Sequence, residues 1–297
     1  MKFLKNNEID FKKWDEVILS SEMPLVFAQS FYLNATSPGW MALVEGDYKC
    51  VMPVTAKKKL NINYLIQPPF TPQLGLFGSY DQNITETFFK YLTEIYGYIS
   101  IELNAANFFT SFKTNDKRTF IIDFGKSYSY NSNTKRNIAK ANKLNLKFEE
   151  VPVNEILLLT KKYFHPFLKN KLKIKPNQIR IFDNLLNSSI EVNKLKTFKV
   201  TNDLQEVCAI AHFIFNSKHA VYLKGTSFDK NANSGSMHFL MHHAIEFFNK
   251  EKILIFDFGG GQSDSLGQFF SGFGASALNY KTLKLNNLPK AIKWLKK

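Results

Sequence analysis

The chain has 297 residues, of which 44% are hydrophobic and 15% aromatic, so it can fill one large core or two ordinary ones. This composition excludes a disordered chain, and two cysteines do not make a disulfide framework. We find no secretory signal and no apolar run of membrane-spanning length, so we expect a cytoplasmic protein without a membrane span.

The formal net charge is +14, but only Arg118, Arg136 and Arg180 among the 39 basic residues are arginine. Two interpretations remain open. The lysines form a solvated surface, or they attract a polyanion such as RNA or an anionic metabolite.

The first half of the chain is predicted to form a mixed sheet. Two apolar runs flank the polar turn Glu45-Gly46-Asp47, which indicates an antiparallel hairpin. A third strand, a helix with apolar residues at three- and four-residue spacing, and a strand parallel to the third follow. Another strand closes the half. In order, these elements are 41–54, 63–66, 84–97, 98–104 and 118–125.

A connecting region follows. Residues 129–150 are predicted to form a helix, capped by Asn133 or Thr134, and then a strand. Two further helices are expected at 153–164 and 177–188.

The second half repeats the element order of the first. Its turn is Thr201-Asn202-Asp203, and its hairpin, helix and closing strands fall at 198–225, 236–251, 253–260 and 278–286. Cys50 and Cys208 are 158 residues apart, and Glu102 and Asp257 are 155 apart. We therefore predict an α/β protein of two tandem lobes, 1–128 and 129–297, each a mixed sheet flanked by helices.

This order of elements resembles the GNAT acyltransferase fold, and two copies in one chain resemble the FemABX-type transferases and their uncharacterised relatives. Four stretches carry the resemblance: "SPGWMALVEGDYKCVMPV" (37–54), "QPPFTPQLGLFGS" (67–79), "NTKRNIAKANKLNL" (133–146) and "FDFGGGQSDSLGQFFSGFGA" (256–275). It implies amide-bond formation, in which an amine attacks an activated acyl group. The donor would be acyl-CoA or aminoacyl-tRNA, with no tightly bound cofactor. The acceptor would be an amine of a small molecule or peptide.

The resemblance places the active cleft where two parallel strands of the second lobe diverge. Tyr222, Lys224 and Asp257 would surround this gap. Asp257 is the candidate base or amine anchor, Lys224 could neutralise an oxyanion, and Tyr222 could protonate a leaving group. Each residue also has a purely structural interpretation. Asp257 would be an ordinary acid at a strand end, Lys224 a surface lysine and Tyr222 an aromatic residue of the core.

Other residues are candidates for substrate binding. Arg136, on a basic helix, could contact an anion, or it could lie on a solvated face. Gln67, Phe70 and Gln73 lie in a proline-rich loop that could line a pocket or be a structural turn, and Glu102 is the first-lobe equivalent of Asp257.

The donor would meet the loop before the helix at 236–251. Ser234, Gly235 and Ser236 could receive its anionic group at the helix N-terminus. The glycines at 259–261 lack the lysine of a phosphate loop, so we expect them to allow close backbone approach, or simply a flexible loop.

No metal is predicted. His238, His242 and Glu246 share one stripe of a helix, but the zincin pattern would require a glutamate where Phe239 stands. Two alternatives to a small-molecule transferase remain. The single glycine of the "NSGS" loop favours a degenerate module that only binds an anionic ligand, and the basic charge suits an aminoacyl transferase that binds tRNA.

Overall fold

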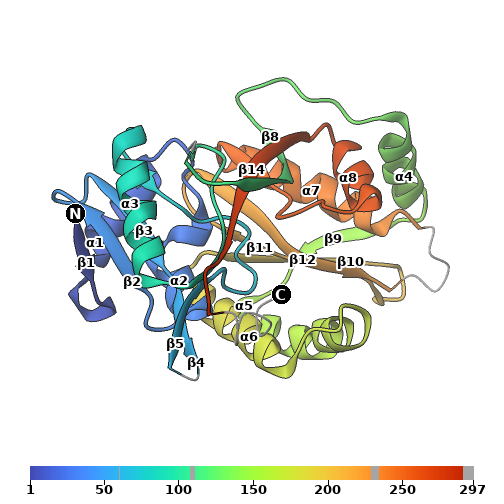
Figure 1. Cartoon of the computed structure of the whole chain (residues 1–297). Helices are drawn as coiled ribbons and strands as arrows, with labels where there is room; N and C mark the ends of the chain where they lie inside the picture. Colours follow the sequence, from blue (N-terminus) through green and yellow to red (C-terminus); the bar gives the residue numbers. More distant parts are fainter. Residues whose placement is uncertain (60, 108–110, 229–233, 290–297) are drawn as a thin grey trace. The chain divides into compact units, whose positions relative to one another are not determined.

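The structure is a computed structural model that describes residues 1–59, 61–107, 111–228 and 234–289. The chain divides into two compact units (Figure 1): Met1–Arg118 with the chain from Asn279 on, and Thr119–Leu278. These limits differ from the predicted lobes 1–128 and 129–297, because strands β8 (Thr114–Asp123) and β14 (Ser276–Asn286) each begin in one unit and end in the other.

The first unit contains two groups of strands. One is the sheet β1–β2–β3–β6, and in the other β4, β5, β7 and β14 are neighbours in that order. The strands are β1 (Lys2–Leu4), β2 (Met41–Glu45), β3 (Cys50–Val54), β4 (Ala56–Lys59), β5 (Ile62–Ile66), β6 (Phe77–Gly78) and β7 (Tyr98–Glu102). The helices are η1 (Asn6–Glu8), α1 (Phe11–Ser20), η2 (Val26–Ala28), α2 (Ser30–Thr36) and α3 (Gln82–Ile95).

The predicted elements of the first half are confirmed. β2 and β3 form the antiparallel hairpin, with Glu45 opposite Cys50, and β5 pairs in parallel with β7. Helix α3 joins that parallel pair; Asp81 caps its first turn, and its apolar face, including Phe88 and Leu92, is buried. A right-handed crossover helix is the usual way to connect two parallel neighbours.

The second unit contains one group of strands in the order β8–β13–β12–β11–β10–β9. Its own strands are β9 (Lys147–Glu150), β10 (Leu195–Thr201), β11 (Val207–Phe215), β12 (His219–Ser227) and β13 (Ile255–Asp257). The helices are α4 (Ser132–Lys143), α5 (Val153–Leu159), the π-helical segments η3 (Thr160–Phe164) and η4 (Phe167–Lys171), α6 (Pro176–Glu191), α7 (Ser236–Lys250) and α8 (Asp264–Ser271). The predicted order is confirmed, but the cap of α4 is Asn131, whose Oδ1 accepts a hydrogen bond from the Thr134 amide at 2.8 Å.

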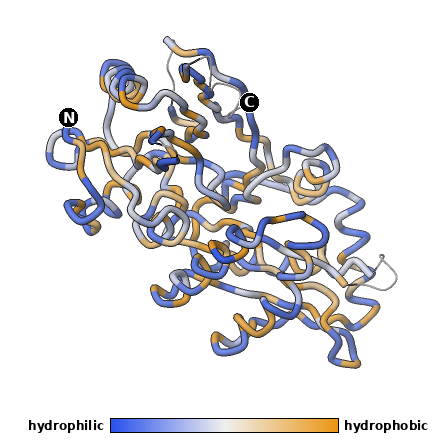
Figure 2. The backbone as a smooth tube through the Cα atoms, turned by 60° about the horizontal axis from the view of Figure 1, so that its bottom comes forward, coloured by the Kyte–Doolittle hydropathy of each residue, from blue (hydrophilic) through white to orange (hydrophobic). Residues whose placement is uncertain are grey.

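Helices cover both faces of the second unit's strands (Figure 1). On one face, Phe198 and Phe213 contact Phe248 of α7. On the other face, His212 contacts Phe164 and Phe182, from η3 and α6. Figure 2 shows hydrophobic and hydrophilic stretches alternating along the chain. The sheet is therefore buried on both sides, as the near-continuous apolar run in β11 requires.

The two closing strands are exchanged, which the sequence pattern does not anticipate. β8, which follows the first copy, pairs antiparallel with β13 of the second unit, with Phe256 opposite Ile122. β14, which follows the second copy, pairs antiparallel with β7 of the first unit, with Leu283 opposite Ile101. Each unit thus contains one strand contributed by the other copy of the repeat.

Candidate functional site

The parallel strands β12 and β13 of the second unit separate after a short contact. They pair only from His219 to Val221, opposite Ile255 to Asp257, although β12 continues to Ser227. The register between β12 and β11 also shifts here: Tyr222 lies opposite Phe213 and Lys224 opposite His212, so Leu223 is the extra residue of a bulge. Regular pairing of the two strands therefore ends at Val221, while β12 continues; the divergence of the strands beyond this point stays a prediction.

The side chain of Asp257 explains why β13 ends. Its Oδ1 accepts a hydrogen bond from the Gly259 amide at 2.8 Å, which forms a turn at the end of β13. Gly259 has φ of 67°, and a Cβ at this position would lie 2.9 Å from the Tyr222 carbonyl oxygen. Only glycine fits such a close left-handed turn. The expected close backbone approach of the glycine loop is therefore present, against β12.

The carboxylate of Asp257 is buried, with 1% of the residue exposed. Its Oδ1 also accepts a hydrogen bond from Thr119 Oγ1 at 2.6 Å, and His219 Nε2 lies 3.4 Å from its Oδ2. A buried carboxylate that accepts two hydrogen bonds in this way fixes the loop after β13, whereas a general base needs access to the proton that it removes. The role of base therefore stays a prediction, and the geometry favours a positioning role.

Lys224 lies on β12 just beyond the split. Desolvation lowers its pKa, and its side chain has no hydrogen bond or ion pair among the described residues. A half-buried ammonium group without a counter-ion is costly, and such groups are typical of sites that bind an anion or exchange a proton. Of the three residues predicted around the gap, Lys224 therefore has the surroundings that best suit a role in anion binding or proton transfer.

Tyr222 has different surroundings from Lys224. Burial raises the pKa of its hydroxyl, which stays protonated, and its ring contacts Phe213 and Phe270. Because Phe213 and His212 are consecutive in β11, the register directs Tyr222 and Lys224 to opposite faces of the strand. The structure brings Tyr222, Lys224 and Asp257 to the same split, but it does not form a hydrogen-bonded triad from them.

His212, opposite Lys224, is a neutral structural residue. Its Nδ1 lies 2.8 Å from Thr197 Oγ1 and its Nε2 lies 3.2 Å from Thr160 Oγ1, so both ring nitrogens are occupied. Burial lowers its pKa to about 3.

This lowered pKa predicts an acid-dependent loss of stability. Below pH 6.5 the unfolded chain takes up a proton at His212 and the folded chain does not, so the free energy of unfolding falls as pH decreases towards 3. Between pH 6.5 and 5 this one group contributes a loss of about 2 kcal/mol. Urea unfolding of wild type and His212→Gln should show a smaller pH dependence in the variant. An identical pH dependence would contradict the assignment.

The N-terminus of α7, where the donor's anionic group is expected, is covered. Gly235 has φ of 76°, and a Cβ there would lie 2.2 Å from the carbonyl oxygen of Asn137 in α4. The Ser236 amide donates to Ser234 Oγ at 3.1 Å, and Ser236 is buried. A carbonyl oxygen at this point repels phosphate, so these three residues do not form an open phosphate cradle. Residues 229–233 of the same expected loop lie outside the described residues.

A hollow of about 520 Å³ lies beside this helix end. It is lined by side chains of α4, α7 and α8 and the turns before them: Asn131, Asn133, Thr134, His238, Ser265, Gln268, Phe269 and Ser271. Arg136 is exposed, and its Nη2 donates to Asn133 Oδ1 at 2.9 Å, which places the guanidinium at the edge of the hollow. The predicted anion contact Arg136 is therefore next to a polar hollow, but Asp257 does not line it. The sequence predicts Asn133 only as a helix cap, and no sequence pattern marks Asn131 or Gln268 as residues that line this hollow.

In the first unit the equivalent gap is filled. Beyond Ile66, the side chain of Gln67 accepts a hydrogen bond from the Glu102 amide at 3.0 Å and donates to the Thr71 carbonyl at 2.8 Å. Leu74 then forms a parallel bridge with Leu103 of the chain after β7. In the first unit, the side chain of Gln67 and the loop after it thus occupy the position that corresponds to the expected donor entrance of the second unit. The two copies are therefore not equivalent.

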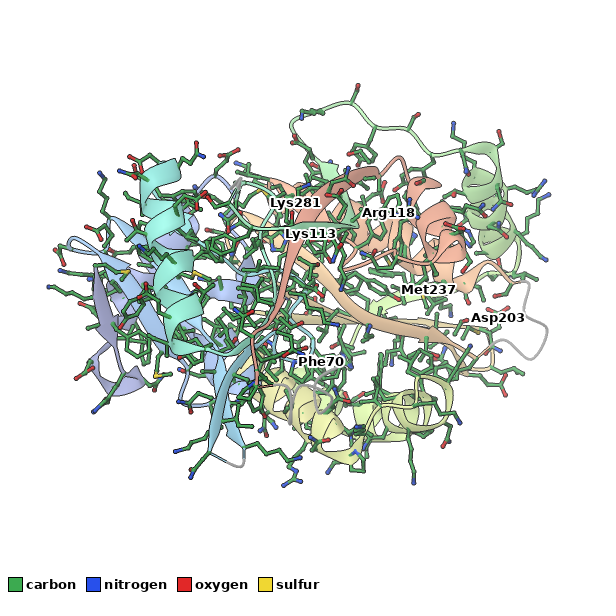
Figure 3. The ribbon with its side chains drawn as sticks, in the orientation of Figure 1. Phe70, Lys113, Arg118, Asp203, Met237 and Lys281 are labelled. Carbon is green, nitrogen blue, oxygen red and sulfur yellow. The ribbon has the colours of Figure 1, made fainter. Side chains whose placement is uncertain are left out.

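The remaining predicted binding residues are also in the first unit. The carbonyl of Phe70, labelled in Figure 3, accepts a hydrogen bond from Tyr32. Gln73 is fully buried, and its amide atoms have no hydrogen-bond partner among the described residues. Glu102 forms an ion pair with Lys117 and lies 3.4 Å from the hydroxyl of Tyr280. A substrate-binding role for Gln67, Phe70, Gln73 and Glu102 stays a prediction.

The filled gap gives a direct test. Gln67→Ala leaves the Glu102 amide and the Thr71 carbonyl without partners, so we expect the free energy of unfolding to fall by about 1–3 kcal/mol. The exposed Asn63, on the same strand, supplies the control Asn63→Ala, which should change stability by less than about 0.5 kcal/mol. Equal effects of the two variants in urea unfolding would show that Gln67 does not hold the gap closed.

Comparison with known proteins shows the fold. The chain matches no protein-family model, and no curated protein is similar to it in sequence. It superposes on FemX with a TM-score of 0.69 and 12% identity over 100% of both chains. It is also similar to the C-terminal domain of a protein from Agrobacterium fabrum assigned as lysylphosphatidylglycerol synthetase, with a TM-score of 0.60 and 9% identity over 96% of this chain and 94% of that one. A tandem GNAT protein from the clavulanic acid biosynthesis pathway superposes with a TM-score of 0.52 and 8% identity over 97% and 99%.

These similarities confirm the predicted fold class. The chain has a tandem GNAT-like fold of the kind found in FemX. In the described part of the chain, no helix is both long and apolar enough to cross a bilayer.

Proposed function

We propose that the chain is an acyl- or aminoacyl-transferase that forms an amide bond on an amine of a small molecule or peptide, with the reaction at the split between β12 and β13. The observation that carries this proposal is the end of parallel pairing between these strands after Val221, with the desolvated Lys224 just beyond it, whose side chain has no hydrogen bond or ion pair among the described residues. The fold shared with FemX and with a tandem GNAT protein supports the transferase class.

The chemistry requires an amine nucleophile and an acyl group held on a carrier. The amine attacks the acyl carbon, a C–N bond forms, and the C–S or C–O bond to the carrier breaks. The amine loses a proton, and the carrier leaves as a thiol or hydroxyl that takes one up. Lys224 serves this reaction in either protonation state: as an ammonium it stabilises the oxyanion, and as an amine it accepts a proton. Its lowered pKa increases the neutral fraction.

The other residues have supporting roles in this proposal. The protonated hydroxyl of Tyr222 is a hydrogen-bond donor at the split, Asp257 fixes the loop that keeps the strands apart, and Arg136 contacts an anionic part of the donor or acceptor at the polar hollow. Carrier phosphates are assigned to this hollow and not to Gly235, because the Asn137 carbonyl covers that residue.

A second candidate is a module that binds an anionic ligand without catalysing a reaction. Two observations favour it: the covered helix end at Gly235, and the buried carboxylate of Asp257, whose Oδ1 accepts two hydrogen bonds. Both would be expected if the catalytic features of the fold had been lost.

One experiment separates the candidates. The full chain is incubated with a panel of acyl-CoA and aminoacyl-tRNA donors and of small amines and peptides, and amide products are measured by mass spectrometry alongside binding by thermal shift. An amide product that depends on Lys224 supports the transferase. Binding without product supports the binding module, and neither binding nor product contradicts both.

A further inference from the structure

Three metal-ligating side chains meet on α7 in a combination that the helix stripe does not predict. His242 Nε2 and His243 Nδ1 lie 3.7 Å and 3.6 Å from the same atom, Oε2 of Glu246. One ligand atom from each of the three residues lies within 4.8 Å of the others. The two histidines are consecutive in sequence, so Glu246 is one turn further along from His242.

The expected member of this cluster, His238, is directed elsewhere. Its ring contacts Phe269 of α8 edge-on, with centroids 4.9 Å apart, and lies 5.8 Å from Phe273. Figure 3 labels its neighbour Met237 at the start of α7. His238 lines the polar hollow and is not one of the three clustered residues.

Contacts from other elements hold the two cluster histidines in place. The hydroxyl of Tyr130 lies 3.3 Å from His242 Nδ1, which leaves Nε2 facing Glu246. The ring of His243 packs between Phe148 of β9 and Phe239, with centroid distances of 5.0 Å and 4.4 Å. Rings fixed in this way lose little freedom when they bind an ion, and a hydrogen bond to the second ring nitrogen is the usual support of a metal-bound histidine.

The two distances to Glu246 are close to those in a tetrahedral transition-metal site. With Zn–N and Zn–O bonds of about 2.0–2.1 Å, neighbouring ligands of a tetrahedral site are about 3.3–3.5 Å apart. The two separations to Glu246 exceed this by only a few tenths of an ångström, and small χ rotations would close the difference.

We infer that His242 Nε2, His243 Nδ1 and the carboxylate of Glu246 bind one divalent transition-metal ion of the Zn²⁺ class. Three protein ligands leave the fourth position of a tetrahedral ion to water or to an anionic group of another molecule. In this state His242 carries its proton on Nδ1 and donates it to the Tyr130 oxygen. The site is independent of the proposed transferase reaction, because none of its three residues lies at the strand split.

Isothermal titration of the full chain, without a histidine tag and freed of metal with a chelator, tests the site with Zn²⁺. We expect one site in the wild type. His243→Asn and Glu246→Gln should each weaken binding by more than about tenfold, and Tyr130→Phe, which removes the support of His242, by about tenfold. His238→Asn is the matched control on the same helix and should bind as the wild type does.

Several results would overturn the inference. They are the absence of Zn²⁺ binding by the wild type, an equal loss in His238→Asn, or wild-type binding by His243→Asn. If His243→Asn does not fold, as judged by circular dichroism, the same comparison is made with His242→Asn and Glu246→Gln. Wild-type affinity in both of those variants would likewise contradict the site.

Discussion

Replacing Lys224 with methionine is expected to lower the kcat/KM of amide formation by about 10²- to 10⁴-fold, the range measured when a group that transfers a proton is removed. Methionine keeps the apolar part of the lysine side chain, so the fold should be preserved. The decrease in kcat/KM then measures the contribution of the amine group alone. The steady-state rate of wild type and variant, with whichever donor and acceptor give product, is the measurement.

Stability separates this effect from damage to the fold. Because desolvation lowers the pKa of Lys224, the folded chain releases this proton at a lower pH than the unfolded chain, and stability rises with pH up to the ordinary lysine pKa of 10.5. Below that window the buried charge is a cost, so Lys224→Met should not lower the melting temperature at neutral pH. Lys196→Met is the control. Lys196 lies on β10 and forms an ion pair with Glu150 of β9 at 2.7 Å, and replacing it should leave the rate of amide formation unchanged. A rate within about twofold of wild type in Lys224→Met would remove Lys224 from the mechanism.

Asp257→Ala is expected to have the largest effect on stability, a loss of about 3–5 kcal/mol in the free energy of unfolding. The variant leaves Thr119 Oγ1, the Gly259 amide and His219 without their shared partner in a buried place. Urea unfolding measures the loss. Asp203→Ala, at the tip of the β10–β11 turn where the side chain is exposed (Figure 3), is the control and should change stability little.

Asp257→Asn decides between the two roles of this residue. Asparagine keeps an oxygen that can accept the Thr119 and Gly259 hydrogen bonds, but it cannot accept a proton at neutral pH. If Asp257 fixes the loop, as its burial favours, Asp257→Asn should keep its rate within a few-fold of wild type. A loss of about 10²-fold in a folded Asp257→Asn would instead establish the carboxylate as the base.

The order of elements was predictable because its signals are local. Apolar periodicity and polar turns such as Thr201-Asn202-Asp203 indicate strands and helices independently of the tertiary structure. A helix that joins two parallel strands then follows from strand geometry. The presence of two copies followed from comparing those local signals.

The contacts of the site were not predictable because they join distant segments. Thr119 meets Asp257 across 138 residues, and the Asn137 carbonyl meets Gly235, yet neither residue carries a pattern. The sequence predicts that Gln67 lines a pocket. In the structure its side chain instead accepts the hydrogen bond of the Glu102 amide, which a backbone carbonyl of a neighbouring strand would otherwise accept. The choice of His243 over His238 as the neighbour of Glu246 depends on Phe269, which belongs to another helix.

The exchanged closing strands impose an order on biosynthesis. β7 ends at Glu102, whereas its antiparallel neighbour β14 lies about 180 residues further along the chain, with Thr282 opposite Glu102. During translation the first unit therefore has an unfilled edge at β7 until β14 has been made, and an exposed edge of this kind favours pairing with other nascent chains. Deleting β14 would consequently destabilise the unit whose other strands are made first.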